Sequence, residues 1–243
     1  TTPSEREPTW TPITGTAPRS DADFWSYVNS IAVSANGIAL ASTSSGIARS
    51  ADGGQTWAQV YPVGSATVTS YDVVFDPNSP NDAVADIDQG TVVYSTDGGQ
   101  TWAKGIGFPS YTSAGERVSL AFNPAVRGSV YALVDNSPRA QPSGEIFHSI
   151  DGGKTWVLLA GTGAFQDYQS GATFGALCAG GECQGGYDNT IIVIPVAGSA
   201  PTIVTGGVII FRSKDGGATW SDAEWGVVGG GYHPDIHAFA YDA

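Results

Sequence analysis

Positively charged residues are scarce in this sequence: its 243 residues include 10 Lys and Arg against 23 Asp and Glu, a formal net charge of −13. Because a strongly negative surface repels phosphate backbones and anionic headgroups, nucleic acid and membrane surfaces are disfavoured as partners. No apolar run approaches the ~18 residues that a membrane-spanning helix needs. Methionine is absent, and the first residues lack the basic start and apolar stretch of a signal peptide. We therefore expect a mature or trimmed chain without membrane insertion.

Cysteine is nearly absent as well. The two cysteines, Cys178 and Cys183, lie in the stretch CAGGEC, whose glycine-rich spacer allows the two sulfurs to meet. We expect a disulfide here, with a pair of free thiols as the alternative. A zinc site is poorly supported, because four-ligand sites need further Cys or His and the chain has three histidines. No P-loop, dinucleotide fingerprint or nucleophile elbow is present either, so we expect no cofactor.

Glycine and proline, in contrast, are abundant. The chain has 33 Gly and 14 Pro, which makes helix bundles and coiled coils unfavourable. Hydrophobic residues make up 41% of the sequence, enough to fill a core and to exclude wholesale disorder.

Four octapeptides of the pattern S-x-D-G-G-x-T-W organise the chain, at residues 50–57, 95–102, 149–156 and 213–220. In each, the aspartate can accept backbone N–H bonds, the glycines can adopt positive φ, and the tryptophan can bury its ring. Each octapeptide therefore predicts a tight turn between two strands. The residues expected to build these turns are Asp52, Trp57, Asp97, Trp102, Asp151, Trp156, Asp215 and Trp220.

Short apolar runs precede and follow every octapeptide, and two more lie upstream of each, without any helical stretch. Four strands per repeating unit predict an all-β fold, a β-propeller of four-stranded antiparallel blades. The expected blades span residues 27–62, 70–108, 117–161 and 188–224 of a single propeller covering 1–243. Residues 9–13 and 237–243 each predict one strand of an incomplete blade. Because such a blade leaves unpaired edges, we expect a larger ring or a further chain, with an aberrant five-blade ring as the alternative.

The octapeptide resembles the Asp-box, or BNR repeat, of sialidases, xyloglucan-active glycoside hydrolases, sortilin-type receptors and photosystem assembly factors. The stretch from GGYDNTIIVIP to HPDIHAFAYDA is most similar to secreted bacterial BNR proteins of the glycosidase-like type. The resemblance covers essentially the whole chain. It implies a secreted or cell-surface protein and a ring of about seven blades.

Residues just before the innermost strands of a propeller converge on one mouth of its channel. Aligning the first strands gathers Glu116 and Asp235 there, with Trp25, Tyr27 and Tyr187 as flat surfaces. Two carboxyls and aromatic platforms suit glycoside cleavage, because one acid protonates the leaving oxygen while its partner acts as base or nucleophile. We therefore predict Glu116 and Asp235 as the catalytic pair and the three rings as sugar-binding residues.

The stretch His233-Pro-Asp235-Ile-His237 is the sharpest local cluster, since alternation along a strand puts its three polar side chains on one side. Three interpretations stay open. The cluster can clamp adjacent blades, it can contact substrate through His233 and His237, or it can hold a divalent metal. Tyr71-Asp72 and Tyr187-Asp188 recur before two first strands, where the aspartate can act as an acid or accept from the next blade's backbone.

These observations favour a secreted carbohydrate-active propeller, a glycoside hydrolase that acts on a neutral polysaccharide. Arg117 is the one arginine placed near the channel, so a cation cluster for an acidic sugar is lacking. The alternative is a non-catalytic extracellular binding, adhesion or surface-assembly module. In that case its open blade edges pair with another chain or another copy.

Overall fold

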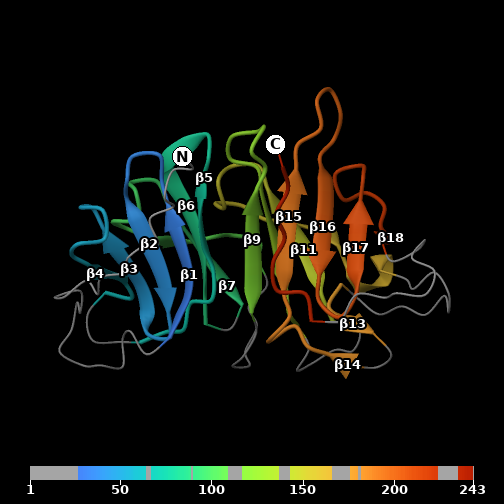
Figure 1. Cartoon of the computed structure of the whole chain (residues 1–243), viewed down its shortest axis with the longest axis horizontal. Helices are drawn as coiled ribbons and strands as arrows, with labels where there is room; N and C mark the ends of the chain where they lie inside the picture. The colour runs from blue at the N-terminus through green and yellow to red at the C-terminus, as the bar shows by residue number, and fades with distance from the viewer. Residues whose placement is uncertain are drawn as a thin grey trace, which may run out of the picture.

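The computed structural model describes residues 27–63, 67–88, 90–108, 117–136, 143–165, 176–179, 182–223 and 235–242. It contains four antiparallel sheets of four strands, each with its strands in sequence order, which confirms the predicted all-β propeller fold (Figure 1). The first sheet comprises β1 (Val28–Val33), β2 (Ala39–Thr43), β3 (Gly46–Ser50) and β4 (Ala58–Tyr61), and the second β5 (Val73–Asp76), β6 (Ser79–Ile87), β7 (Thr91–Ser95) and β8 (Ala103–Lys104). The third comprises β9 (Val118–Phe122), β10 (Val130–Val134), β11 (Glu145–Ser149) and β12 (Val157–Ala160), and the fourth β15 (Thr190–Ile194), β16 (Thr202–Gly206), β17 (Ile210–Ser213) and β18 (Ser221–Asp222).

Two small elements lie between the third and fourth sheets. A single 3-10 turn, η2, covers Thr162–Ala164, and the hairpin of β13 (Cys178–Ala179) and β14 (Glu182–Cys183) is closed by the predicted disulfide between Cys178 and Cys183. No helix in the described part of the chain is long and apolar enough to cross a membrane.

Apolar clusters fill the spaces between neighbouring sheets. Leu40 and Ile47 of the first sheet pack against Val93 of the second, and Val84 of the second packs into a cluster with residues of the third, including Trp156. Phe211 of the fourth sheet belongs to a cluster shared with the third. Each sheet is therefore held by burial of apolar side chains against the next sheet along the chain.

The four octapeptides form nearly identical turns. In the first, Asp52 Oδ1 accepts from Ser50 Oγ at 2.8 Å and from the Thr56 amide at 2.9 Å, while Asp52 Oδ2 accepts from Thr56 Oγ1 at 2.6 Å. The Trp57 indole N–H donates to the Gly54 carbonyl at 3.0 Å. The other three turns repeat these bonds around Asp97, Asp151 and Asp215.

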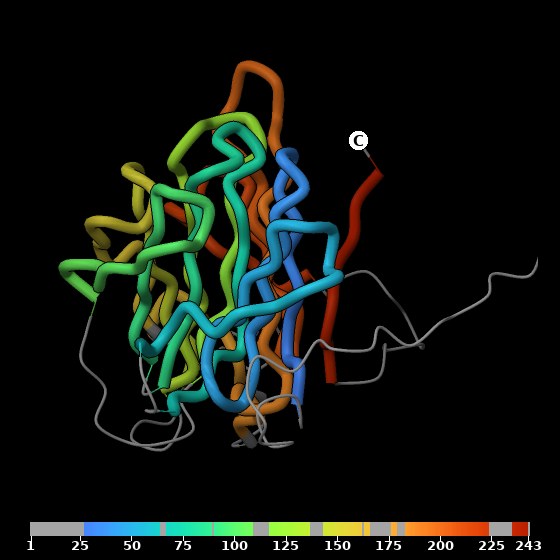
Figure 2. The backbone as a smooth tube through the Cα atoms, turned by 90° about the vertical axis from the view of Figure 1, so that its left-hand side faces the viewer, coloured from blue at the N-terminus to red at the C-terminus, as the bar shows by residue number. Residues whose placement is uncertain are grey.

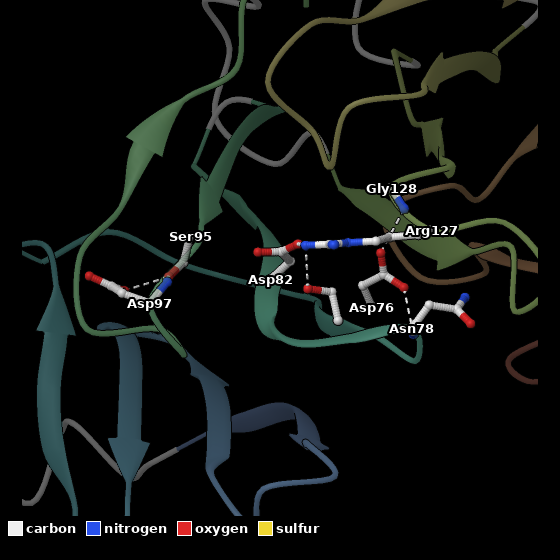
Figure 3. A network of polar contacts seen from close by, with 8 residues as sticks. Asp76, Asn78, Asp82, Ser95, Asp97, Arg127 and Gly128 are labelled. Atoms are coloured by element: carbon white, nitrogen blue, oxygen red, sulfur yellow. Dashed lines mark hydrogen bonds and ion pairs between the residues drawn. The ribbon is translucent and has the colours of Figure 1, made fainter.

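A polar network also ties the second sheet to the third (Figure 3). The buried Asp76 carboxylate accepts from the Gly128 amide at 2.7 Å, and Arg127 pairs with Asp82 at 3.2 Å and donates to Ser79 Oγ at 3.0 Å. These contacts fix the loop between β9 and β10 against the second sheet.

The inner strands β1, β5, β9 and β15 follow one another along one side of the molecule, each in contact with the next. Residues 235–242 run as an extended segment on that same side, in front of the fourth sheet (Figures 1 and 2). They form no ladder with a described strand, so the assignment of 237–243 to a further blade stays a prediction. Residues 9–13 lie outside the described residues.

Candidate functional site at the inner strands

Strand pairing gives the four sheets a common numbering. In each sheet, one residue of the third strand lies three positions before the serine that begins the octapeptide. The residues of the second strand that pair with it are Ser42, Asp86, Leu133 and Gly206. The inner-strand residues beside these four positions are therefore equivalent as well. They are Ser30, Ser119 and Thr190, and Asp72, which directly precedes β5 and accepts from the Asp86 amide through its carbonyl at 3.1 Å; these are three hydroxyls and one carboxyl.

All four of these residues line one polar hollow of about 280 Å³, which we call the axial hollow. Its other lining residues are Asn29, Tyr71, Val74, Arg117, Leu120, Asn189, Ile191 and His237. Hydroxyl, amide, guanidinium and carboxyl groups thus converge at the start of the inner strands. Pockets for small molecules have volumes of roughly 300 to 1,000 Å³, so this hollow suits a small polar group.

Hydrogen bonds between neighbouring sheets fix these side chains. Asp72 Oδ1 accepts from Ser30 Oγ at 3.1 Å, and Asp72 Oδ2 accepts from the Leu120 amide at 2.9 Å. Ser119 Oγ donates to the Asn189 carbonyl at 2.6 Å. Asp72 therefore links the first three sheets, as expected if it accepts from the backbone of the next blade.

Two carboxyls with raised pKa lie at the hollow: Asp72 in its lining and Asp86, which is bonded to the backbone of Tyr71 and Asp72. Burial, together with the Asp72 charge, raises the pKa of Asp86 to about 7, although the carboxyl accepts backbone N–H bonds from Tyr71 and Asp72 at 2.7 Å and from Val118 at 3.3 Å. Burial also raises the pKa of Asp72, against the hydrogen bonds that it accepts. Desolvation disfavours the charged form of both groups.

A second carboxyl pair lies where residues 235–242 meet the fourth sheet. The Asp188 side chain is fully buried, and its Oδ1 lies 3.2 Å from His237 Nε2. Burial and the neighbouring carboxyl of Asp235 raise the pKa of Asp188 to about 6. The ring of Tyr187 meets the His237 ring edge to face, with centroids 4.6 Å apart.

The structure brings together three of the residues that the sequence pointed to: Tyr187, Asp235 and His237 are neighbours, and His237 lines the hollow. Tyr187 is 65% exposed and Tyr27 is 70% exposed, but Tyr27 is not among the residues that line the hollow. The predicted Glu116, Trp25 and His233 lie outside the described residues. Among the described residues, no group of three His, Cys, Asp or Glu is arranged to hold a metal ion.

Sequence reasoning missed most of the lining residues. Ser30, Ser119, Asn29 and Asn189 are ordinary strand or turn residues by composition, and nothing local marks them. One signal was available: counting back from the octapeptide serines along paired strands identifies equivalent positions, but only once the strand registers are known.

Comparisons with known proteins place this fold. The family model described as sortilin, neurotensin receptor 3 (Sortilin-Vps10) matches residues 45–174, which is more than half of the chain. No curated protein matches the sequence.

Two solved enzymes are similar in structure. A GH74 xyloglucanase from Xanthomonas campestris has 21% sequence identity and a TM-score of 0.53, covering 80% of this chain and 30% of its own. An ancestral GH74 enzyme has 17% identity and a TM-score of 0.50, covering 82% of this chain and 34% of its own. The chain thus spans about a third of the length of these enzymes, and the likeness shows the fold alone.

Proposed function

The chain belongs to the Sortilin-Vps10 family, and from this propeller scaffold we propose that it is a carbohydrate-active protein that binds a neutral saccharide in the axial hollow. One observation carries the proposal: four equivalent inner-strand positions present three hydroxyls and a carboxyl to a single hollow. Sugars bind through many hydrogen bonds to such groups and through stacking on aromatic rings. The exposed ring of Tyr187 lies beside His237 at the edge of the hollow and would supply the stacking surface.

The volume of the hollow limits what enters it. About 280 Å³ accommodates a small polar group rather than a long chain, so a polysaccharide would insert one sugar ring and run along the inner strands on either side. The disulfide between Cys178 and Cys183 fits an oxidising compartment, which supports a secreted or cell-surface location.

Binding is tested by calorimetric titration with oligosaccharides cut from xyloglucan and from cellulose. Thr190→Val removes one hydroxyl from the hollow at nearly constant shape, and we expect about 3- to 10-fold weaker binding, the worth of one hydrogen bond. The control is Thr202→Val on β16, at the opposite end of the same sheet. Equal affinity of both variants and the wild type would exclude the hollow as the site.

Hydrolysis is the reaction that this site would perform, with Glu116 and Asp235 as the acid and base. Asp188 is a poor partner for Asp235 in this chemistry, because the two carboxyls are immediate neighbours, so that Asp235 raises the pKa of Asp188, and hydrolysis needs a separation of about 5 to 9.5 Å. Glu116 directly precedes the lining residue Arg117. We expect Glu116→Gln and Asp235→Asn to lower the release of reducing sugar by about 100-fold or more. Unchanged release would remove both assignments.

A second candidate function is assembly, favoured by the exposed apolar face of β1. Ile31 is 61% exposed, whereas the equivalent Val73, Leu120 and Ile191 are 1%, 4% and 8% exposed because each packs on the preceding sheet. We propose that a second copy of the chain covers this face with the open side of one of its blades, extending the sheet-to-sheet packing already present.

Sedimentation velocity tests the assembly. We expect a dimer that strengthens with salt, since a net charge of −13 on each copy opposes association. Ile31→Lys should abolish it. The control is Val157→Lys on β12, which makes the same charge change at a residue that is 64% exposed. A wild-type monomer at all salt concentrations contradicts this candidate.

A further inference from the structure

Residues 235–242 pack against the fourth sheet at Gly206 and Gly207, and we call this contact the seat. The Ile236 amide donates to the Gly207 carbonyl at 3.1 Å, and a Cβ added to Gly206 would lie 2.5 Å from Ile236 Cγ2 and 2.8 Å from the Phe239 ring. The equivalent positions of the other sheets carry the side chains of Ser42, Asp86 and Leu133. The fourth sheet alone has glycine there, and the space is filled by the segment that passes in front of it (Figure 1).

The polar contact of this seat joins two carboxyls. The Asp188 oxygens are buried and, within the described part of the chain, accept no regular N–H or O–H hydrogen bond; their neighbours are His237 Nε2 at 3.2 Å and the Asp235 carboxyl. Ionised carboxylates only accept hydrogen bonds, so two of them in contact require a proton between them.

Backbone strain at the same point indicates that the contact is enforced. Asp235 has φ of +89°, and it is the one non-glycine residue with positive φ in the described ranges. Residues with a Cβ are disfavoured there, and such outliers persist where surrounding contacts over-determine the conformation. Here those contacts are the Asp188 carboxyl and the packing of Ile236 directly after Asp235.

We propose that Asp188 and Asp235 share one proton, which fastens residues 235–242 to the fourth sheet, and that Asp188 is thereby a positioning residue for His237 in the wall of the axial hollow. The attachment of residues 235–242, which contribute His237 to the lining of the axial hollow, then depends on pH. For ligand binding, the inference rests on the proposed saccharide function; the fastening itself does not.

The direction of the pH dependence follows from the charges that face the pair. Asp188 is faced by Asp235 and His237 from the segment and by Arg117 from the start of β9. Its pKa, raised to about 6, lies above the 3.8 of an exposed aspartate, so the shared proton is fully held at low pH and is lost as the pH rises through 6. Above that pH the two carboxylates repel each other, and the attraction of Arg117 and His237 offsets this only in part.

Hydrogen exchange of the Ile236 amide tests the fastening without any ligand, because that amide is bonded to the Gly207 carbonyl. After correction for the intrinsic rate, we expect its protection to fall by about 10-fold between pH 5 and pH 8, since pH 5 lies one unit below the folded pKa of about 6 and each unit is tenfold in equilibrium. Asp188→Asn should remove this step, because its carboxamide donates to Asp235 at every pH. Asp242→Asn, at an exposed position of the same segment, should keep the step.

The outcomes separate the two proposals. Flat protection in the wild type, or an unchanged step in Asp188→Asn, overturns the inference; if Asp188→Asn does not fold, Asp235→Asn makes the same test from the other side. Xyloglucan oligosaccharide binding is measured across the same pH range. A protection step without any binding rejects the saccharide function and keeps the fastening. Binding that does not weaken above pH 6 rejects the positioning role and keeps the saccharide function.

Discussion

The pKa of an aspartate in this molecule is lowered in the octapeptide turns and raised at the start of the inner strands. Hydrogen bonds from Thr56 and Ser50 lower the pKa of the exposed Asp52 to about 2, and bonds from Thr219 and Ser213 lower that of Asp215 to about 2. At the inner end, burial raises the pKa of Asp86 to about 7. Asp52 and Asp215 are therefore ionised at neutral pH and stabilise their turns as hydrogen-bond acceptors, whereas Asp86 binds a proton near neutral pH.

Asp86 makes the stability of the fold depend on pH. Its folded pKa of about 7 exceeds the unfolded 3.8, so its contribution is complete below pH 3.8 and is lost as the pH rises through 7. We expect the free energy of unfolding, measured with urea, to fall between pH 4 and pH 8 by up to about 4 kcal/mol from this group. Asp86→Asn should flatten that slope. Asp82→Asn, on the same strand but paired with the exposed Arg127, is the control, and an equal flattening there would contradict the assignment.

Elements of this chain were predictable wherever the signal is local. The octapeptides fix turn residues, the runs around them fix strands, and CAGGEC fixes the disulfide, because each depends on residues close in sequence. The axial hollow was less accessible. Ser119 and Asn189 meet only through the packing of two sheets, and the contact of Asp188 with Asp235 requires a strained backbone that no sequence pattern announces.

The second glycine of an octapeptide both adopts a positive φ and allows close contact with the preceding sheet, and the two effects can be measured separately. Gly152 and Gly153 both have positive φ, +77° and +87°, but a Cβ at Gly152 meets open space while one at Gly153 lies 2.8 Å from Val84 of the preceding sheet. We expect Gly152→Ala to cost about 1 to 2 kcal/mol by backbone strain alone. Gly153→Ala should cost about 1 to 3 kcal/mol more by overpacking. Urea unfolding of both variants measures the difference, and equal losses would show that sheet-to-sheet contact at this turn is unimportant.

Across the whole molecule, the four sheets differ in how many of their faces are covered by a neighbouring sheet. The second and third sheets pack on neighbours at both faces: Val93 and Val84 of the second, and Val130 and Leu133 of the third, belong to separate apolar clusters on the two sides. The first sheet has the exposed β1 at one face. Local stability follows the density of buried contacts, so the open sheet should be the first to loosen.

Native-state hydrogen exchange by mass spectrometry checks this gradient. Peptides from the second and third sheets should exchange slowest, near the rate of global unfolding, and peptides from β1 should exchange fastest among the inner strands. Val130→Ala, which leaves a gap in the cluster between the second and third sheets, should cost about 2 kcal/mol and speed exchange in both sheets together. Uniform exchange across all four sheets would instead indicate a single cooperative unit.

The separation of turn-forming residues from hollow-lining residues has a consequence for how such proteins diversify. The octapeptides carry the folding information at one end of each sheet, while Ser30, Asp72, Ser119 and Thr190 carry the recognition chemistry at the other. A duplicated or exchanged blade would bring its own scaffold with it and alter one quarter of this polar layer. New binding preferences can then arise by recombination of whole units, without passing through a sequence that fails to fold.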